Sequence, residues 1–71
     1  MTFNQWEQYE INLIRTYHGT ATSDAQIAQV LRKRLEIMTH DQWSQPSNRR
    51  AGEMLDVEKL IAKLESEARA A

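Results

Sequence analysis

The sequence predicts an all-α fold, a three-helix bundle with an extended C-terminal helix in one small domain of 71 residues. Apolar residues recur at spacings of three and four in three segments, which is the period of an amphipathic helix, and no stretch alternates like a strand. Gly19 and Pro46 lie between these segments. Because the chain has no cysteine, helix packing or self-association must stabilise its small core.

The first helix is expected over about residues 4–18. Thr2 with Gln5, or Asn4 with Glu7, gives the capping-box pattern that starts a helix. The apolar side chains expected on one face of this helix are Phe3, Trp6, Leu13, Ile14 and Tyr17.

Gly19 is a plausible C-terminal cap for this helix, and a short turn leads to a second helix over about residues 24–38. Ser23 with Gln26 provides its capping box. The apolar stripe predicted for it consists of Ile27, Val30, Leu31, Leu35 and Met38.

The third helix is expected over about residues 45–69, with Ser44 as its cap and Pro46 in its first turn, where proline is tolerated. About 24 helical residues span roughly 36 Å, which is long for a three-helix module. Its apolar stripe has a coiled-coil spacing, so its C-terminal half is expected to form a homodimer or to bind a partner protein; alternatively, the same stripe completes the chain's own core. The residues of this predicted dimer or partner surface are Leu60, Ile61, Leu64 and Ala68.

Three charged residues fall on apolar stripes: Glu10 in the first helix, Arg34 in the second and Arg50 at the start of the third. A buried carboxylate without a partner is costly. We therefore expect a structural ion pair of Glu10 with Arg34 or Arg50. The alternative is that the arginines only lay their aliphatic stems along apolar surface.

The net charge is −1, but residues 32–50 carry five basic and two acidic side chains between acidic flanks. Such a basic centre either steers an anionic partner to one face or reflects the uneven scatter of charge in a short chain.

One series of residues in the first two helices is typical of a known class: Trp6, Glu10, Leu13, Ile14, Tyr17-His18-Gly19, Asp24 and the "QIAQVL" segment. Through these, residues 6–35 resemble the Myb/SANT and wider homeodomain-like class. The resemblance implies a helix-turn-helix module whose third helix enters the DNA major groove. A longer segment separates the second and third helices here than in that class.

The resemblance implies that the first turn of the third helix contacts base edges, with Gln45, Ser47, Asn48 and Arg49 as its candidates. Arg32 and Lys33 are expected to contact phosphates.

The expected function is therefore that of a dimeric DNA-binding regulator or accessory factor with duplex DNA as partner. The alternative is a protein-binding adaptor or inhibitor that does not bind nucleic acid. We expect no enzyme activity, cofactor, small-molecule substrate or metal, because His18 and His40 lack a ligand spacing and no catalytic motif is present. No apolar run is long enough to cross a membrane, so a cytoplasmic location is expected.

Overall fold

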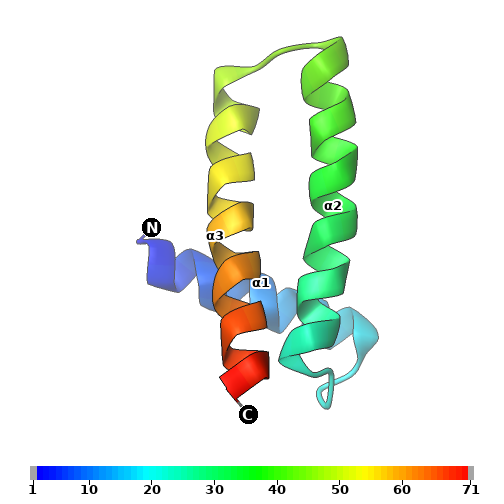
Figure 1. Ribbon diagram of the computed structural model, residues 1–71, viewed down its shortest axis with the longest axis vertical. Helices are drawn as coiled ribbons and strands as arrows, with labels where there is room; N and C mark the ends of the chain where they lie inside the picture. Colours follow the sequence, from blue (N-terminus) through cyan, green and yellow to red (C-terminus); the bar gives the residue numbers. More distant parts are fainter. Residues whose placement is uncertain (1, 71) are drawn as a thin grey trace.

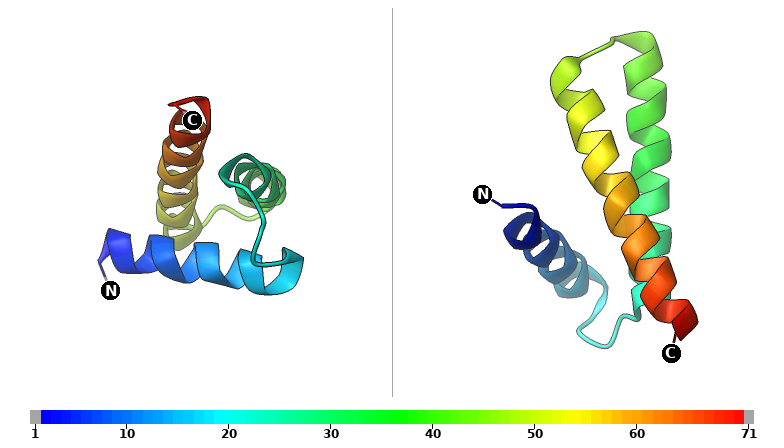
Figure 2. Two further views of the ribbon diagram at one scale, coloured as in Figure 1. Left: turned by 90° about the horizontal axis from the view of Figure 1, so that it is seen from below. Right: turned by 60° about the vertical axis from the view of Figure 1, so that its left-hand side comes forward.

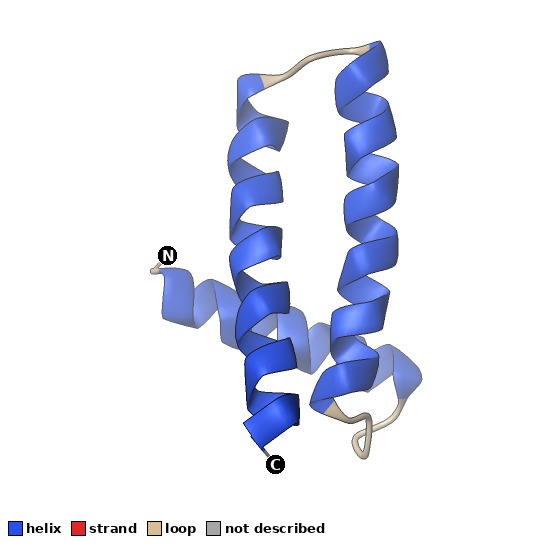
Figure 3. Ribbon diagram, in the orientation of Figure 1, coloured by secondary structure: helices blue, strands red, loops and turns tan. Residues whose placement is uncertain are grey.

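The computed structural model describes residues 2–70 and confirms the all-α, three-helix prediction. Helix α1 covers Phe3–His18, α2 covers Asp24–Ser44 and α3 covers Asn48–Ala70, as Figures 1 and 3 show. The second and third helices run antiparallel and side by side as a long hairpin, and α1 crosses the end where α2 begins and α3 ends (Figures 1 and 2). The 23 residues of α3 span about 35 Å, which accounts for the longest extent of the molecule, 37 Å.

Local capping chemistry starts α1 and α2 where the sequence predicts. The backbone N–H groups of Thr2 and Gln5 each donate to the other residue's side chain, over 2.9 and 3.2 Å, so this is the capping box that forms. Ser23 and Gln26 form the equivalent box at the start of α2. Gly19 ends α1 with a φ of 108°, a conformation that favours glycine.

Helix α2 is six residues longer than predicted, because it continues through residues 39–44, where the sequence suggested a break. These residues include neither glycine nor proline, and they lie beyond the core, so they carry no apolar stripe to mark them as helical. The helix ends at Ser44, and Gln45, which precedes Pro46, leaves the helical conformation with φ −141° and ψ 85°.

Helix α3 starts three residues later than predicted, with Ser47 rather than Ser44 as its cap. The hydroxyl of Ser47 accepts a hydrogen bond from the backbone N–H of Arg50 over 3.3 Å. Pro46 consequently lies before the cap instead of in the first turn.

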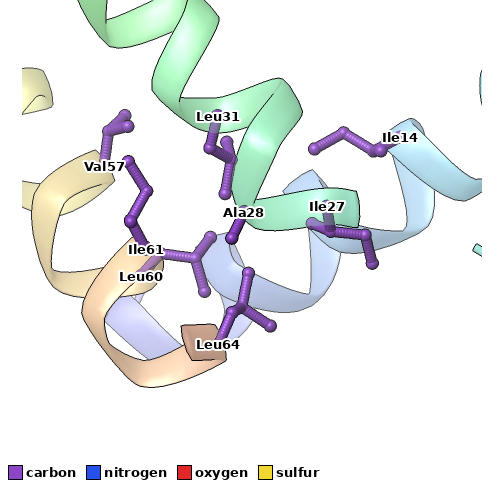
Figure 4. Close-up of a cluster of buried hydrophobic side chains, with 8 residues drawn as sticks. All are labelled: Ile14, Ile27, Ala28, Leu31, Val57, Leu60, Ile61 and Leu64. Atoms are coloured by element: carbon purple, nitrogen blue, oxygen red, sulfur yellow. The ribbon is translucent and has the colours of Figure 1, made fainter. Parts of the chain in front are cut away.

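The core lies between the lower half of the hairpin and the middle of α1, and Figure 4 shows it in close-up. Ile27, Leu31 and Leu60 have no measurable solvent exposure. The apolar stripes of α2 and α3 therefore face each other, which is the alternative that the sequence left open for α3. The buried apolar side chains are Ile14, Ile27, Ala28, Leu31, Val57, Leu60, Ile61 and Leu64.

The predicted apolar face of α1 was partly wrong, because Tyr17 is 80% exposed and Phe3 is 37% exposed. The buried face of α1 is formed by Glu7, Glu10 and Ile14. Since α1 crosses the hairpin instead of running along it (Figure 2), the side chain of Tyr17 near its C-terminal end faces solvent. At its N-terminal end, the centroid of the partly exposed Phe3 ring lies 6.0 Å from Nζ of Lys59 on α3.

Candidate functional site

The end of the hairpin where α2 leads into α3 lies beyond the core. We call residues 37–55, the last turns of α2, the connecting loop and the first turns of α3, the hairpin tip. No side chain in the tip is buried, and every member of the core cluster lies outside it. Helix α1 does not cover the tip (Figure 1). The large apolar side chains exposed on the tip are Ile37 (60%), Trp43 (88%) and Leu55 (59%).

The loop of the tip is held by the side-chain amide of Gln42. Its nitrogen donates to the backbone oxygen of Ser47 over 3.0 Å, and its oxygen accepts from the backbone N–H of Ser47 over 3.1 Å. The guanidinium of Arg50 donates to the backbone oxygen of Gln45 over 2.6 Å and to the oxygen of Gln42 over 3.3 Å. The tip is therefore an ordered turn between two helices.

Of the two partners considered for Glu10, Arg34 is the one that contacts it. Nη1 of Arg34 donates to Oε2 of Glu10 over 2.5 Å, and the Glu10 side chain is only 8% exposed. Arg50 makes no contact with Glu10, so that part of the prediction was wrong. The reason is that α2 extends past residue 38 and carries the start of α3 away from α1 (Figure 1).

A second buried carboxylate, Glu7, was missed by the sequence reasoning. Its side chain is 4% exposed and accepts a hydrogen bond from Nζ of Lys63 over 2.8 Å. This contact raises the pKa of Lys63. The signal was present, because Glu7 lies four residues before Ile11 and seven before Ile14, on the stripe that packs against the hairpin.

Arg32 was expected to face phosphates, but it binds a carboxylate of its own chain. Its Nε and Nη2 donate to the two oxygens of Glu65 over 2.8 and 2.6 Å, which links α2 to α3 by a bidentate ion pair. These hydrogen bonds, with the attraction between the charges, raise the pKa of Arg32 and lower the pKa of Glu65. A bidentate contact of Nε and Nη2 with a phosphate would require this pair to open, whereas Nη1 takes no part in it.

Lys33 lines a hollow together with Arg32 and Glu36, and it also lines a groove beside α2. The other residues expected to bind nucleic acid lie at the tip, away from Arg32. Asn48 and Arg49 are exposed at the start of α3, with the Arg49 guanidinium 3.6 Å from Glu53. Gln45 lies in the loop, and the backbone of Ser47 is hydrogen-bonded to Gln42.

The predicted dimer or partner surface on α3 is largely inside the molecule. Leu60, Ile61 and Leu64 are at most 4% exposed, and only Ala68 is half-buried. These leucine and isoleucine side chains pack against α2 because the hairpin brings the two stripes together (Figure 4). They are thus unavailable to a partner while the chain is folded, and the assignment of this surface was wrong.

An open groove of about 700 Å³ runs beside α2, from the end of α1 to the tip. Its apolar lining consists of Val30, Ile37 and Met38, and its charged lining consists of Lys33 and Arg34. The lining includes no aspartate or glutamate.

A smaller hollow of about 300 Å³ lies between the tip and Arg34. Its lining includes Arg34, Arg49 and Arg50 together with Ser47 and Glu53. Arg49 is the one basic residue of this hollow that was expected to bind nucleic acid, and Ser47 lies beside it.

Comparison of the chain with protein-family models, with curated proteins and with solved structures gives no match. Within residues 2–70, no three histidine, aspartate or glutamate side chains are grouped as a metal ion would require. None of the helices described is both long and apolar enough to span a membrane.

Proposed function

We propose that this chain is a protein-binding module whose hairpin tip receives a structural element of a partner protein. The observation that supports this proposal is that residues 37–55 contain no buried side chain although they carry Ile37, Trp43 and Leu55. Two antiparallel helices leave apolar faces open unless a further element packs on them. Helix α1 does so for the core half of the hairpin, and the partner does so for the tip.

The side chains of the tip suit this role. Tryptophan is enriched among the residues that dominate the energy of protein interfaces. Trp43 stands on the last turn of a helix, and the Gln42 contacts order the adjoining loop, so little conformational entropy is lost on binding.

Photo-crosslinking in cells that produce the protein tests the proposal. A photoreactive phenylalanine derivative replaces Trp43 in one variant and Tyr17 in the control, because Tyr17 is an aromatic residue with a similar exposure of 80% but lies on α1. We expect one defined protein to be cross-linked from position 43 and not from position 17.

The cross-linked protein is then purified and titrated into the full chain by isothermal calorimetry. We expect Trp43→Ala to weaken its binding by about tenfold or more and Tyr17→Ala to leave it unchanged. Equal binding by both variants, or the same adducts from both positions, would contradict a partner site at the tip.

DNA binding is the second candidate function, and the hollow between the tip and Arg34 supports it. Arg49 is the most exposed arginine there, with a side chain 91% exposed, and Asn48 is exposed beside it at the start of α3. A phosphate at this position would meet both the guanidinium and the helix N-terminus.

Fluorescence anisotropy with a labelled DNA duplex at low salt tests this second candidate. The variant replaces both Lys33 and Arg49 by glutamine. Because neither side chain holds α1 or the loop in place, the fold should be retained. We expect salt-dependent binding by the native chain and weaker binding by this double variant. The absence of any anisotropy change for the native chain would remove DNA as a partner.

A further inference from the structure

The groove beside α2 combines an apolar floor with a lining whose charged residues are all basic. Val30, Ile37 and Met38 lie along one side of α2 over about two turns, and Lys33 and Arg34 lie between them. Lys33 forms no ion pair within the described chain, residues 2–70. Arg34 uses Nη1 for Glu10, but 45% of its side chain remains exposed.

The shape of the groove favours a helix over a small molecule. From Gln26 to Met38 it follows about 12 residues of α2, or roughly 18 Å, and it stays open to solvent. Sites for small molecules usually enclose about 70–90% of the ligand surface. An amphipathic helix needs only one face covered, and an open groove provides that.

The molecule already contains one example of this mode of binding. Helix α1 docks on the hairpin by placing Ile14 in the core, while Glu7 and Glu10 bind Lys63 and Arg34. An acidic amphipathic helix therefore fits the cations and apolar positions of this hairpin. The groove presents the same combination, with Lys33 as the unpaired cation.

The acidic residues of this chain's own amphipathic helix α1, Glu7 and Glu10, already bind Lys63 and Arg34, so we assign the groove to a helix of a different protein and not to a second copy. We propose that the groove binds an amphipathic helix of a partner protein, with apolar side chains over Val30, Ile37 and Met38 and carboxylates opposite Lys33 and Arg34. This inference rests on the proposed role in protein binding and supplies the chemistry of the partner.

Fluorescence anisotropy with labelled peptides of about 16 residues, roughly four helical turns, tests the inference on the full chain. The probe has leucines on one face and glutamates beside them. A matched peptide has lysine in place of each glutamate, and a third has the composition of the probe without its amphipathic order. We expect the acidic amphipathic peptide to bind most tightly and the lysine peptide most weakly.

Charge reversal in the protein assigns the binding to the groove. We expect Lys33→Glu to weaken binding of the acidic peptide by about tenfold and to improve binding of the lysine peptide. Lys59→Glu, the same charge change on the exposed side of α3, should leave both affinities unchanged. In the methyl NMR spectrum, the acidic peptide should shift the signals of Ile37 and Met38.

Equal binding of the acidic and lysine peptides would overturn the inference, and so would peptide-induced shifts confined to other methyl groups. Shifts of the Ile37 and Met38 signals on dilution of the protein alone would also overturn it, because they would indicate self-association. Ile37 and Met38 belong to both the groove and the tip, so Trp43, which does not line the groove, and Lys33, which lies outside the tip, are the positions that separate the two proposals. If Trp43→Ala abolishes binding of the partner protein and Lys33→Glu does not affect it, the protein-binding role stands and the groove is not the binding site.

Discussion

The carboxylate of Glu10 lies within hydrogen-bond distance of the Arg34 guanidinium, and this contact joins α1 to α2 at the edge of the core. Glu10 is nearly inaccessible, whereas almost half of the Arg34 side chain faces solvent. Water therefore compensates the arginine if the pair is broken, while the carboxylate depends on its partner.

Glu10→Gln keeps the shape of the side chain and removes its charge, so it tests this contact. We expect the free energy of unfolding to fall by about 1–2 kcal/mol, because a hydrogen bond between charged groups becomes a weaker one. Chemical denaturation measures the change. Glu36→Gln, on an exposed position of α2, is the control, and an equal effect of both substitutions would refute a stabilising pair.

Lys63→Met should destabilise the protein, because it leaves the carboxylate of Glu7 buried without a partner. Adding Glu7→Gln to this variant should recover part of the loss, since the remaining buried group is then neutral. Thermal unfolding of the two single variants and the double variant measures this coupling. If the two substitutions act additively, Glu7 and Lys63 do not stabilise each other in solution.

Leu60→Ala should lower the free energy of unfolding by about 2–4 kcal/mol, because it opens a cavity where Leu60 is fully buried. Leu55→Ala is the matched control on α3 and should change it by about 0.5 kcal/mol or less, since Leu55 is exposed. Denaturation at several protein concentrations separates this explanation from a dimer. A midpoint that rises with concentration and loses that dependence in Leu60→Ala would place Leu60 in a dimer interface.

Gln42→Ala should loosen the hairpin tip by removing two hydrogen bonds to the backbone of Ser47. The expected loss of stability is about 1 kcal/mol. Amide hydrogen exchange at Ser47 should accelerate more than exchange in the core. Gln29→Ala is the control, because it makes the same change in helix propensity at an exposed position of α2. A similar exchange rate at Ser47 in both variants would mean that Gln42 does not hold the loop.

The pair of Arg32 and Glu65 should make a small, pH-dependent contribution to stability. The pKa of Glu65 is lower in the folded chain than its ordinary value of 4.5, so the unfolded state binds more protons as the pH falls toward and below that value. The stabilisation is therefore complete above about pH 4.5 to 5 and is lost in more acidic solution. The difference in melting temperature between the native chain and Arg32→Gln should shrink over this acidic range. A difference that is constant from neutral pH to pH 2 would contradict the contribution of this ion pair.

The candidate site was less predictable than the fold, and Arg32 and Glu7 show why. A helical wheel places Arg32 outside the apolar stripe of α2, which is correct, but it cannot show that Glu65 of α3 lies beside it. Glu7 was overlooked because charged residues are usually assigned to solvent. Both errors concern contacts between residues more than thirty positions apart in the sequence.

The sequence by itself determined what depends on neighbouring residues: the three helices, the capping box of α2, the end of α1 at Gly19 and the apolar stripes of α2 and α3. These features follow from hydrogen bonds within one or two turns and from the period of the helix. Only the tertiary structure decided that α1 crosses the hairpin, that Arg34 rather than Arg50 binds Glu10, and that the tip extends beyond the core. The reason is that these features depend on where one helix ends and how another packs against it, and neither is encoded in the pattern of a single segment.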